Sequence, residues 1–589
     1  MLLKRFFVSM LGSLAAIWIS LMLVILLCMC FAISSLISSF TDQDKASVEE
    51  HSILQVDLSG EIVEQLSVPT FSDVVNGVKA PTVLGNIIDA LAAAKTDDKI
   101  DGVVIRCKGS AAGIATREAI REAIADFKSS GKWVIAYGDS YAQADYYIAS
   151  VADEVYINPV GELTLNGLAS GIPFFKGLLD KLGVEVQVVK VGTFKSAVEP
   201  FILNNMSEAN RLQTQVYLDG IWGEMVKAIA ESRKLTPEKI NLYADSLMTF
   251  VDTQKLVDLK LVDGLKYENE YTDYLKDKTE KKHDDDLNIV SVSQYLKGAK
   301  VPNTKENDNK IAIYYACGDI TEDGKEGIAS SRVVPDILEL ADDDDIEAMV
   351  LRVNSGGGSA FASEQIWHSI EVFKSKGKKV YVSMGDYAAS GGYYISCNAD
   401  KIYAQPTTLT GSIGIFGMIP CFNGLVSDKL GVNVDFVTTN TYGAQPNSFY
   451  PMSAPVRAKM QDMVNRGYEL FTSRCADGRH MPQDSIKAIA EGRVWDGISA
   501  KRIGLVDELG SLNQAVKALA AEMGYKKYEV VNYPESKTNF WEIFSEFSTQ
   551  MKASALKEEL GEFYPAYEQV KRIAHDDPIQ ARMDFQVIY

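Results

Sequence analysis

The chain has 589 residues, too many for one ordinary hydrophobic core, so two or more domains are expected. Apolar residues make up 47% of the chain, as in a globular protein. The formal net charge of -20 argues against a nucleic-acid-binding protein, because such proteins need a basic face. The seven cysteines form no CxxC pair, so the sequence predicts neither a zinc ribbon nor a disulfide framework.

The N-terminal region, residues 1–45, contains one long apolar segment. Lys4 and Arg5 precede it, and Ala15 through Ile37 is long enough to span a bilayer as a helix. Basic residues before the segment and acidic residues after it predict a single-pass anchor with the N-terminus inside and the body outside. A cleaved signal peptide is the alternative, but the segment is longer than a signal-peptide apolar region and no convincing cleavage site follows.

The second half of the chain repeats the first at an offset of roughly 250 residues. Each copy alternates β-branched segments with segments of helical apolar spacing, which predicts an α/β domain in each half. We expect the two repeats to cover residues 46–297 and 298–589. The charge-dense residues 276–286 are typical of an exposed linker between them. The expected elements are strands at 103–106 and 349–353 and helices at 117–131 and 364–377.

The two copies differ at the positions that could carry chemistry. Ser390 of the second copy corresponds to Gln143 of the first, so only the second copy has a candidate nucleophile. Lys195 of the first copy corresponds to Gly443 of the second. Each half therefore holds one part of a possible site.

Ser390 lies between two alanines and two glycines, after an apolar run. This pattern predicts a strand, a tight turn and a helix start, which places the hydroxyl near a helix N-terminus. Such a position suits a nucleophile whose product is an oxyanion. The alternative is a small-residue helix packed tightly on a sheet.

Lys195 is the candidate base. None of the five histidines lies in a glycine-rich or strand-end setting. A lysine can act as a base if burial keeps it neutral, and Lys195 has an unusually apolar context in residues 188–201. The alternative is an exposed loop lysine, the commoner fate of this residue type.

Residues 354–358, NSGGG, follow an expected strand and expose backbone N–H groups that could bind an oxyanion. The alternative is an ordinary tight turn. The segment matches neither common nucleotide-binding glycine motif.

Four motifs, taken with the duplication, resemble the signal peptide peptidase A (protease IV) family in its long tandem form. They are MVLRVNSGGG at 349–358, GDYAASGGYYIS at 385–396, TLTGSIG at 408–414 and VGTFKSAVEPF at 191–201. The resemblance implies a fold of the ClpP/crotonase superfamily. The expected fold class is therefore α/β, with two tandem domains of spiral ββα units preceded by one transmembrane helix.

The resemblance also implies the role of each site residue. Ser390 would be the nucleophile and Lys195 the general base, and Ser412 would orient the lysine amine. Backbone N–H groups of Gly357 and Gly391 would form the oxyanion hole. The pattern is compatible with a dyad inside one chain or between two subunits.

The expected function is that of a serine endopeptidase anchored in the bacterial inner membrane, with its body on the periplasmic side. Its expected substrates are remnant signal peptides and other apolar peptides near the bilayer. The resemblance further implies a homotetramer, and no cofactor or metal is expected. Two alternatives stay open: a non-catalytic peptide-binding scaffold, and a crotonase-like acyl-CoA enzyme, against which the anchor and the missing adenine-binding signature count.

Overall fold

A computed structural model describes most of the chain after its N-terminal region. The described residues are 18, 20–22, 24, 48–65, 80–303, 307–324, 326–534 and 579–583. The predicted membrane anchor lies almost entirely outside them. No helix within the described part of the chain is both long and apolar enough to cross a membrane.

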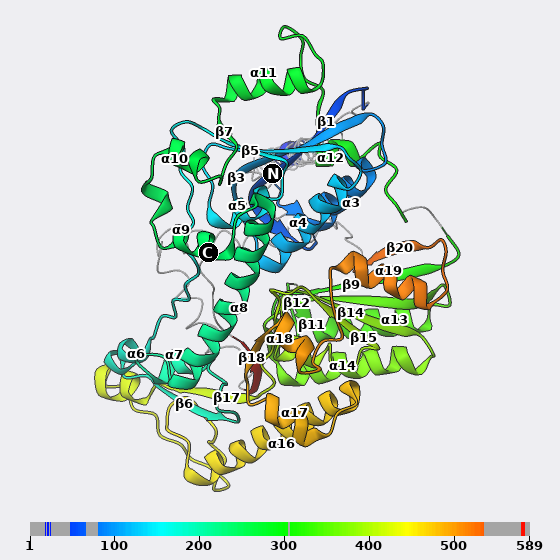
Figure 1. Cartoon of the computed structure of the whole chain (residues 1–589). Coiled ribbons are helices and arrows are strands. Elements are labelled where there is room, and N and C mark those ends of the chain that lie inside the picture. The colour runs from blue at the N-terminus through cyan, green and yellow to red at the C-terminus, as the bar shows by residue number, and fades with distance from the viewer. Residues whose placement is uncertain are drawn as a thin grey trace, which may run out of the picture.

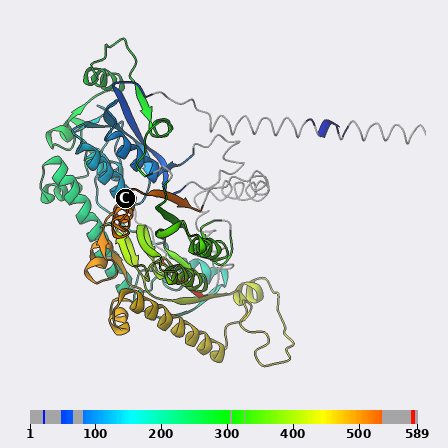
Figure 2. The ribbon, with the colours of Figure 1, turned by 90° about the vertical axis from the view of Figure 1, so that its right-hand side faces the viewer.

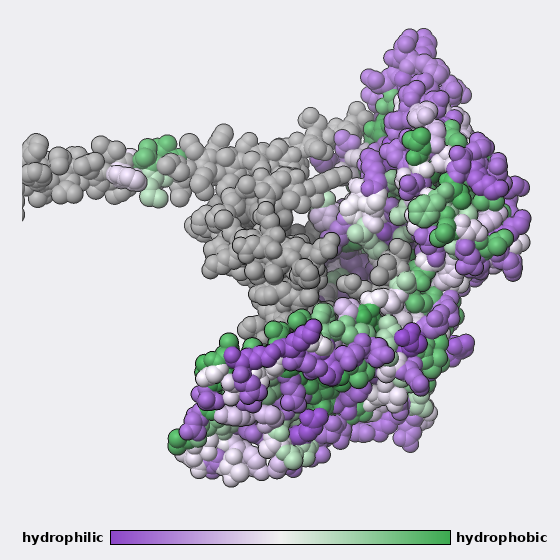
Figure 3. Space-filling view, turned by 90° about the vertical axis from the view of Figure 1, so that its left-hand side faces the viewer, coloured by the Kyte–Doolittle hydropathy of each residue, from purple (hydrophilic) through white to green (hydrophobic). Residues whose placement is uncertain are grey.

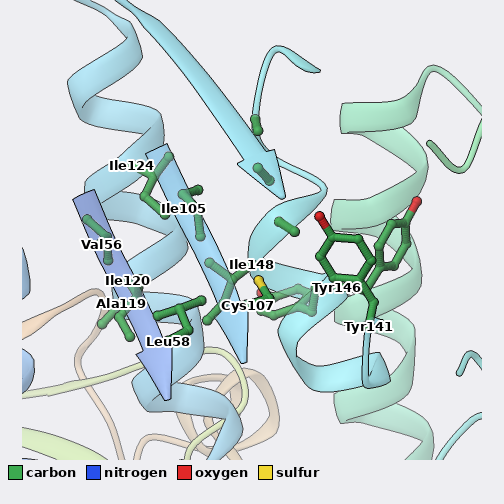
Figure 4. Packing of buried hydrophobic residues seen from close by; sticks show 14 of the residues in the cluster. Val56, Leu58, Ile105, Cys107, Ala119, Ile120, Ile124, Tyr141, Tyr146 and Ile148 are labelled. Atoms are coloured by element: carbon green, nitrogen blue, oxygen red, sulfur yellow. The ribbon is translucent and has the colours of Figure 1, made fainter. Parts of the chain in front are cut away.

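The first repeat is built on a seven-stranded parallel sheet in the order β2-β1-β3-β4-β5-β7, with β8 paired to β1. Helices cover it, and the buried apolar side chains of strand and helix interdigitate between the layers (Figure 4). Its strands are β1 Ser52–Val63, β2 Thr82–Val83, β3 Ile100–Ala111, β4 Trp133–Gly138, β5 Glu154–Ile157, β7 Gly264–Leu265 and β8 Ile289–Ser291. Its main helices are α3 Leu84–Ala94, α4 Ile114–Lys128, α5 Gln143–Ala149, α8 Glu208–Arg233, α11 Glu268–Lys278 and α12 Val292–Leu296.

The second repeat is built on an eight-stranded sheet in the order β18-β16-β14-β12-β9-β20, with β15 paired to β14 and β19 paired to β15. Helices again cover this sheet (Figure 1). Its strands are β9 Lys310–Cys317, β12 Ile346–Ser355, β14 Lys379–Ala389, β15 Lys401–Ala404, β16 Leu409–Gly411, β18 Val494–Asp496, β19 Glu508–Leu509 and β20 Glu529–Tyr533. Its main helices are α13 Ser330–Asp342, α14 Ala360–Ser375, α15 Gly391–Tyr394, α16 Ala454–Arg479, α17 Gln483–Ile489, α18 Gly497–Arg502 and α19 Leu512–Glu522.

A third sheet joins the repeats, in the order β11-β10-β13-β21-β17-β6. Strand β6 comes from the first repeat and pairs antiparallel with β17 of the second over its whole length. Strand β21 comes from the C-terminal region and lies between β13 and β17. The bounds are β6 Glu185–Lys190, β10 Ile320–Thr321, β11 Ile328–Ala329, β13 Gly357–Ser359, β17 Phe416–Cys421 and β21 Ile579–Arg582.

Buried polar contacts also hold the repeats together. Asp386, shortly before the end of β14, accepts hydrogen bonds from the backbone N and the hydroxyl of Thr116 at the start of α4, at 2.9 and 2.7 Å. Glu64 of the first repeat forms a buried ion pair with Arg352 of β12 at 2.6 Å. Since unpaired charges are costly in a protein interior, these contacts favour one relative placement of the repeats.

The predicted α/β character is confirmed, and the expected elements are present in both repeats. The strands at 103–106 and 349–353 lie within β3 and β12, and the two predicted helices correspond to α4 and α14.

The prediction that residues 276–286 link the repeats is wrong. The run begins inside α11, and the chain then returns to the first sheet as β8 and α12. Its charges face solvent in a loop after α11, at the hydrophilic upper end of the molecule (Figures 1 and 3). High charge density therefore marked exposure, and not a domain boundary.

Glu118 of α4 provides a test of the interface between the repeats. Its side chain is buried and accepts a 2.7 Å hydrogen bond from Thr407 of the second repeat. Burial raises the pKa of Glu118 from 4.5 to about 8, although the hydrogen bonds from Thr407 oppose the shift. The folded protein therefore keeps this proton where the unfolded chain releases it. The contribution of this protonated carboxyl to the free energy of unfolding is therefore fully present below about pH 4.5 and is lost as the pH rises through about 8.

Glu118→Gln cannot ionise and should be more stable than the native protein at pH 9, by about 1 kcal/mol or more, with a smaller difference at pH 5. Thermal unfolding midpoints at both pH values measure this effect. Glu162→Gln, at an exposed position, is the control and should follow the native profile. Equal pH profiles for Glu118→Gln and the native protein would show that ionisation of the buried carboxyl does not lower the stability of the folded protein.

Candidate active site

Ser390 occupies the sharp junction between β14 and α15. It is completely buried, and its backbone has φ 55° and ψ -114°, a conformation that costs energy for any residue except glycine. Its N–H donates to Gly411 O at 2.8 Å, which holds the turn in place. The predicted order of strand, turn and helix is therefore observed, with the turn reduced to Ser390 itself.

The small residues around Ser390 are required by close packing. A Cβ atom on Gly392 would lie 2.5 Å from Ser355 O, and one on Gly391 would lie 2.7 Å from Ser363 Oγ. Larger residues would therefore push α15 away from β12, which ends at Ser355, and from α14, which contains Ser363.

Lys195 and Ser390 meet within one chain. The Lys195 Nζ atom lies 2.7 Å from Ser390 Oγ, 3.1 Å from Ser412 Oγ and 3.0 Å from Ser412 O. The lysine side chain is only 1% exposed, so the environment penalises its charged form. A neutral amine has two N–H donors for the two Ser412 oxygens and one lone pair for the Ser390 hydroxyl. An ammonium, with three N–H donors, could make the same three contacts, so the contacts fix the position of the amine beside the Ser390 hydroxyl, and its burial favours the neutral form.

The Lys195 segment follows β6 and is held against the second repeat. Phe194 N donates to Glu491 O at 2.9 Å. A Cβ on Gly192 would lie 2.4 Å from Glu491 O, and one on Gly492 would lie within 2.7 Å of the Lys195 backbone. Glycine at both positions therefore allows the backbones of the two repeats to touch beside the lysine.

Gln213, on α8, ties this segment to the strand beside Ser412. Its Nε2 donates to Phe194 O and Ser196 Oγ, both at 3.0 Å, on either side of Lys195. Its Oε1 accepts from Val494 N of β18 at 3.2 Å. No pattern in the sequence singles out Gln213, because a single glutamine on a helix carries no signal of a distant contact.

The two predicted oxyanion donors lie side by side. A Cβ on Gly357 would lie 2.6 Å from Gly391 N, and Gly357 has φ 102°, which favours glycine. The N–H of Gly391 has no hydrogen-bond acceptor among the described residues, so it is available to an oxyanion. The N–H of Gly357 donates to Ser355 Oγ at 3.1 Å and is partly engaged.

Strand β21 passes directly beside these donors. It runs antiparallel to both β13 and β17, with Gly358 opposite Ala581 and Phe416 opposite Gln580. The Ala581 carbonyl oxygen lies 2.1 Å and 3.1 Å from the positions that Cβ atoms would take on Gly357 and Gly391. An extended peptide segment therefore lies across the site, held by strand pairing on both sides. No pattern in the sequence predicts that residues 579–582 reach this site.

The residues that correspond to Ser390 and Lys195 in the opposite repeat make structural contacts or face solvent. Gln143, in place of a serine, is buried and accepts from Asn166 N and Gly167 N, both at 2.9 Å. Gly443, in place of a lysine, is exposed in the loop between β17 and α16, which projects from the molecule in Figure 2. Among the residues that the structure describes, the serine and the lysine therefore form a single combined site, made from both repeats.

The chain is similar in sequence to known peptidases. The sequence model of Peptidase family S49 matches residues 126–282 and 372–526. The chain is 38% identical to Protease 4 of Haemophilus influenzae over 463 residues, which cover 75% of this chain and 73% of that protein. It is 36% identical to Protease 4 of Salmonella typhi, covering 82% and 79% of the two chains. It is 29% identical to the chloroplastic serine protease SPPA of Arabidopsis thaliana, covering 85% and 73%.

Among solved structures, a ClpP1 mutant from Listeria monocytogenes aligns with 36% of this chain and 95% of its own, at 16% identity. The TM-score of 0.24 is too low to support an argument about this fold.

Replacing Gln213 should misplace the lysine without removing it. Gln213→Met keeps the side-chain length and loses all four hydrogen bonds of the amide, the fourth being donated to Asn210 Oδ1 at 3.4 Å. We expect the rate at which Ser390 reacts with a fluorophosphonate to fall by roughly 10- to 100-fold, because small misplacements of reacting groups are costly. Gln215→Met, at an exposed position on the same helix, is the matched control. A native labelling rate in Gln213→Met would show that Gln213 does not position Lys195.

Proposed function

Because the chain belongs to peptidase family S49, we propose that it is a serine endopeptidase in which Ser390 is the nucleophile and Lys195 the general base. One observation carries this assignment: the buried Lys195 Nζ lies 2.7 Å from Ser390 Oγ, and each repeat supplies one of the two residues. This distance is within hydrogen-bond reach, which direct proton transfer between the two groups requires.

The first half of the reaction forms an acyl-enzyme. Neutral Lys195 takes the Ser390 hydroxyl proton as Oγ bonds to the scissile carbonyl carbon. The carbonyl oxygen becomes an oxyanion and is stabilised by the N–H of Gly391 and the adjacent glycine loop. The lysine ammonium then gives its proton to the leaving nitrogen, and the C–N bond breaks.

The second half of the reaction releases the acyl group. A water molecule gives a proton to neutral Lys195 and attacks the ester carbon. The ester bond to Ser390 breaks, and Oγ regains a proton from the lysine. Ser412 accepts hydrogen bonds from the amine throughout and keeps it directed at Ser390.

The position of β21 supports a peptide as the substrate. A peptide can pair its backbone with both β13 and β17, as β21 does, whereas an acyl-CoA offers no repeating backbone donors and acceptors for such pairing. The peptidase therefore accounts for the site better than the crotonase-like alternative.

We propose remnant signal peptides and other apolar peptides as substrates, with the body held near a bilayer by the apolar segment at Ala15 through Ile37. The periplasmic position and the homotetramer are part of the same proposal and rest on the family resemblance.

Removing either member of the dyad should abolish turnover. Ser390→Ala and Lys195→Ala should each lower kcat for an apolar peptide by about 1000-fold or more, since members of a catalytic unit fail together. Ser412→Ala should have a smaller effect of about 10- to 100-fold, because the base remains. Steady-state kinetics with a fluorogenic apolar peptide measure all three.

Lys181→Ala and Ser375→Ala, at exposed positions, are the matched controls. Near-native turnover in Ser390→Ala or Lys195→Ala would refute the dyad. Failure of native Ser390 to react with a fluorophosphonate, together with intact peptide binding, would favour the non-catalytic scaffold.

A further inference from the structure

Strand β21, which lies across the active site, carries a charged side chain that contacts the second repeat. Arg582 of β21 follows Ala581, the residue whose carbonyl lies beside Gly357 and Gly391. Its guanidinium forms an ion pair with Asp319 at 2.9 Å. The Arg582 side chain is 10% exposed and that of Asp319 is 43% exposed, so the pair is partly open to solvent.

The glycine loop allows Asp319 to reach this far. Asp319 directly precedes β10, and β13 separates β10 from β21 in the sheet. At the shared register position Ile320 pairs with Gly358, which in turn pairs with Ala581. Because Gly357 and Gly358 have no side chains, the carboxylate of Asp319 can reach across β13 to a side chain on the third strand.

Asp319 is held in a fixed turn. The N–H of Gly318 donates to Asn354 O at 3.0 Å, which joins the turn to the strand leading into the glycine loop. The N–H of Ile328 donates to Asp319 O at 2.9 Å. The carboxylate therefore keeps a constant position relative to the oxyanion donors, as a specificity site requires.

We propose that Asp319 is a specificity-determining residue that favours a basic side chain on the substrate. The position selected is the one that Arg582 takes in β21, directly after Ala581, whose carbonyl oxygen lies beside Gly357 and Gly391. This inference rests on the proposed peptidase function. Asp319 binds the substrate side chain and takes no part in the proton transfers.

The size of the preference follows from the exposure of the pair. A buried charge-assisted hydrogen bond can contribute a large selectivity, but partial solvent access screens this one. We expect a basic residue to be favoured over a neutral one by about 3- to 10-fold.

The test compares two peptides that differ only at the selected position, with Arg in one and Gln in the other. The measured quantity is the ratio of their kcat/KM values with the full chain. Strand β21 of the protein itself competes equally with both peptides, so its effect cancels from the ratio. The native protein should favour the Arg peptide, and Asp319→Asn should bring the ratio close to one.

Asp319→Lys should reverse the preference towards a third peptide with Glu at that position. Asp323→Asn, at an exposed position of the same segment, is the matched control and should keep the native ratio. Equal use of the Arg and Gln peptides by the native protein, or a ratio that Asp319→Asn leaves unchanged, would overturn the inference.

Binding of the same peptides to full-length Ser390→Ala separates this inference from the proposed function. The ratio of their Kd values reports the contribution of Asp319 without turnover. If native protein binds but does not cleave the peptides, the peptidase proposal fails, and the Kd ratio in Asp319→Asn still decides whether this residue reads the basic side chain.

Discussion

The contact between Lys195 Nζ and Ser390 Oγ is the constraint that the rest of the structure has to satisfy. The two residues come from different repeats, so a hydrogen bond of 2.7 Å can persist only if the repeats hold one fixed relative position. In the proposed mechanism, a shift of about 1 Å would be enough to impair proton transfer between the two residues. Strand pairing and buried polar contacts between the repeats oppose such a shift.

Two kinds of contact hold the repeats in place. Strand β6 pairs with β17 along its whole length, which carries the lysine segment of the first repeat onto the second. Buried polar groups, such as Glu64 with Arg352 and Asp386 with Thr116, then restrict the remaining freedom. Backbone pairing sets the register, and the buried polar groups make other placements unfavourable because they would leave charges unpaired.

Comparison of the two copies predicted the members of the site, but not the residues that support them. Ser390 and Lys195 stood out because their counterparts, Gln143 and Gly443, cannot perform the same chemistry. Gln213 did not stand out, since its role depends on where α8 passes. The charged run at 276–286 was misread because charge density indicates exposure and carries no information on which sheet the chain enters next.

The sequence by itself determined the duplication, the α/β alternation and the pairing of one serine with one lysine. These properties depend on local residue type and spacing, which the chain displays directly. Only the tertiary structure decided that Lys195 and Ser390 meet within one chain, that β21 lies across the site, and that Asp319 contacts Arg582. Those contacts join residues up to several hundred positions apart, and the pairing of strands across the interface, not any local pattern, brings them together.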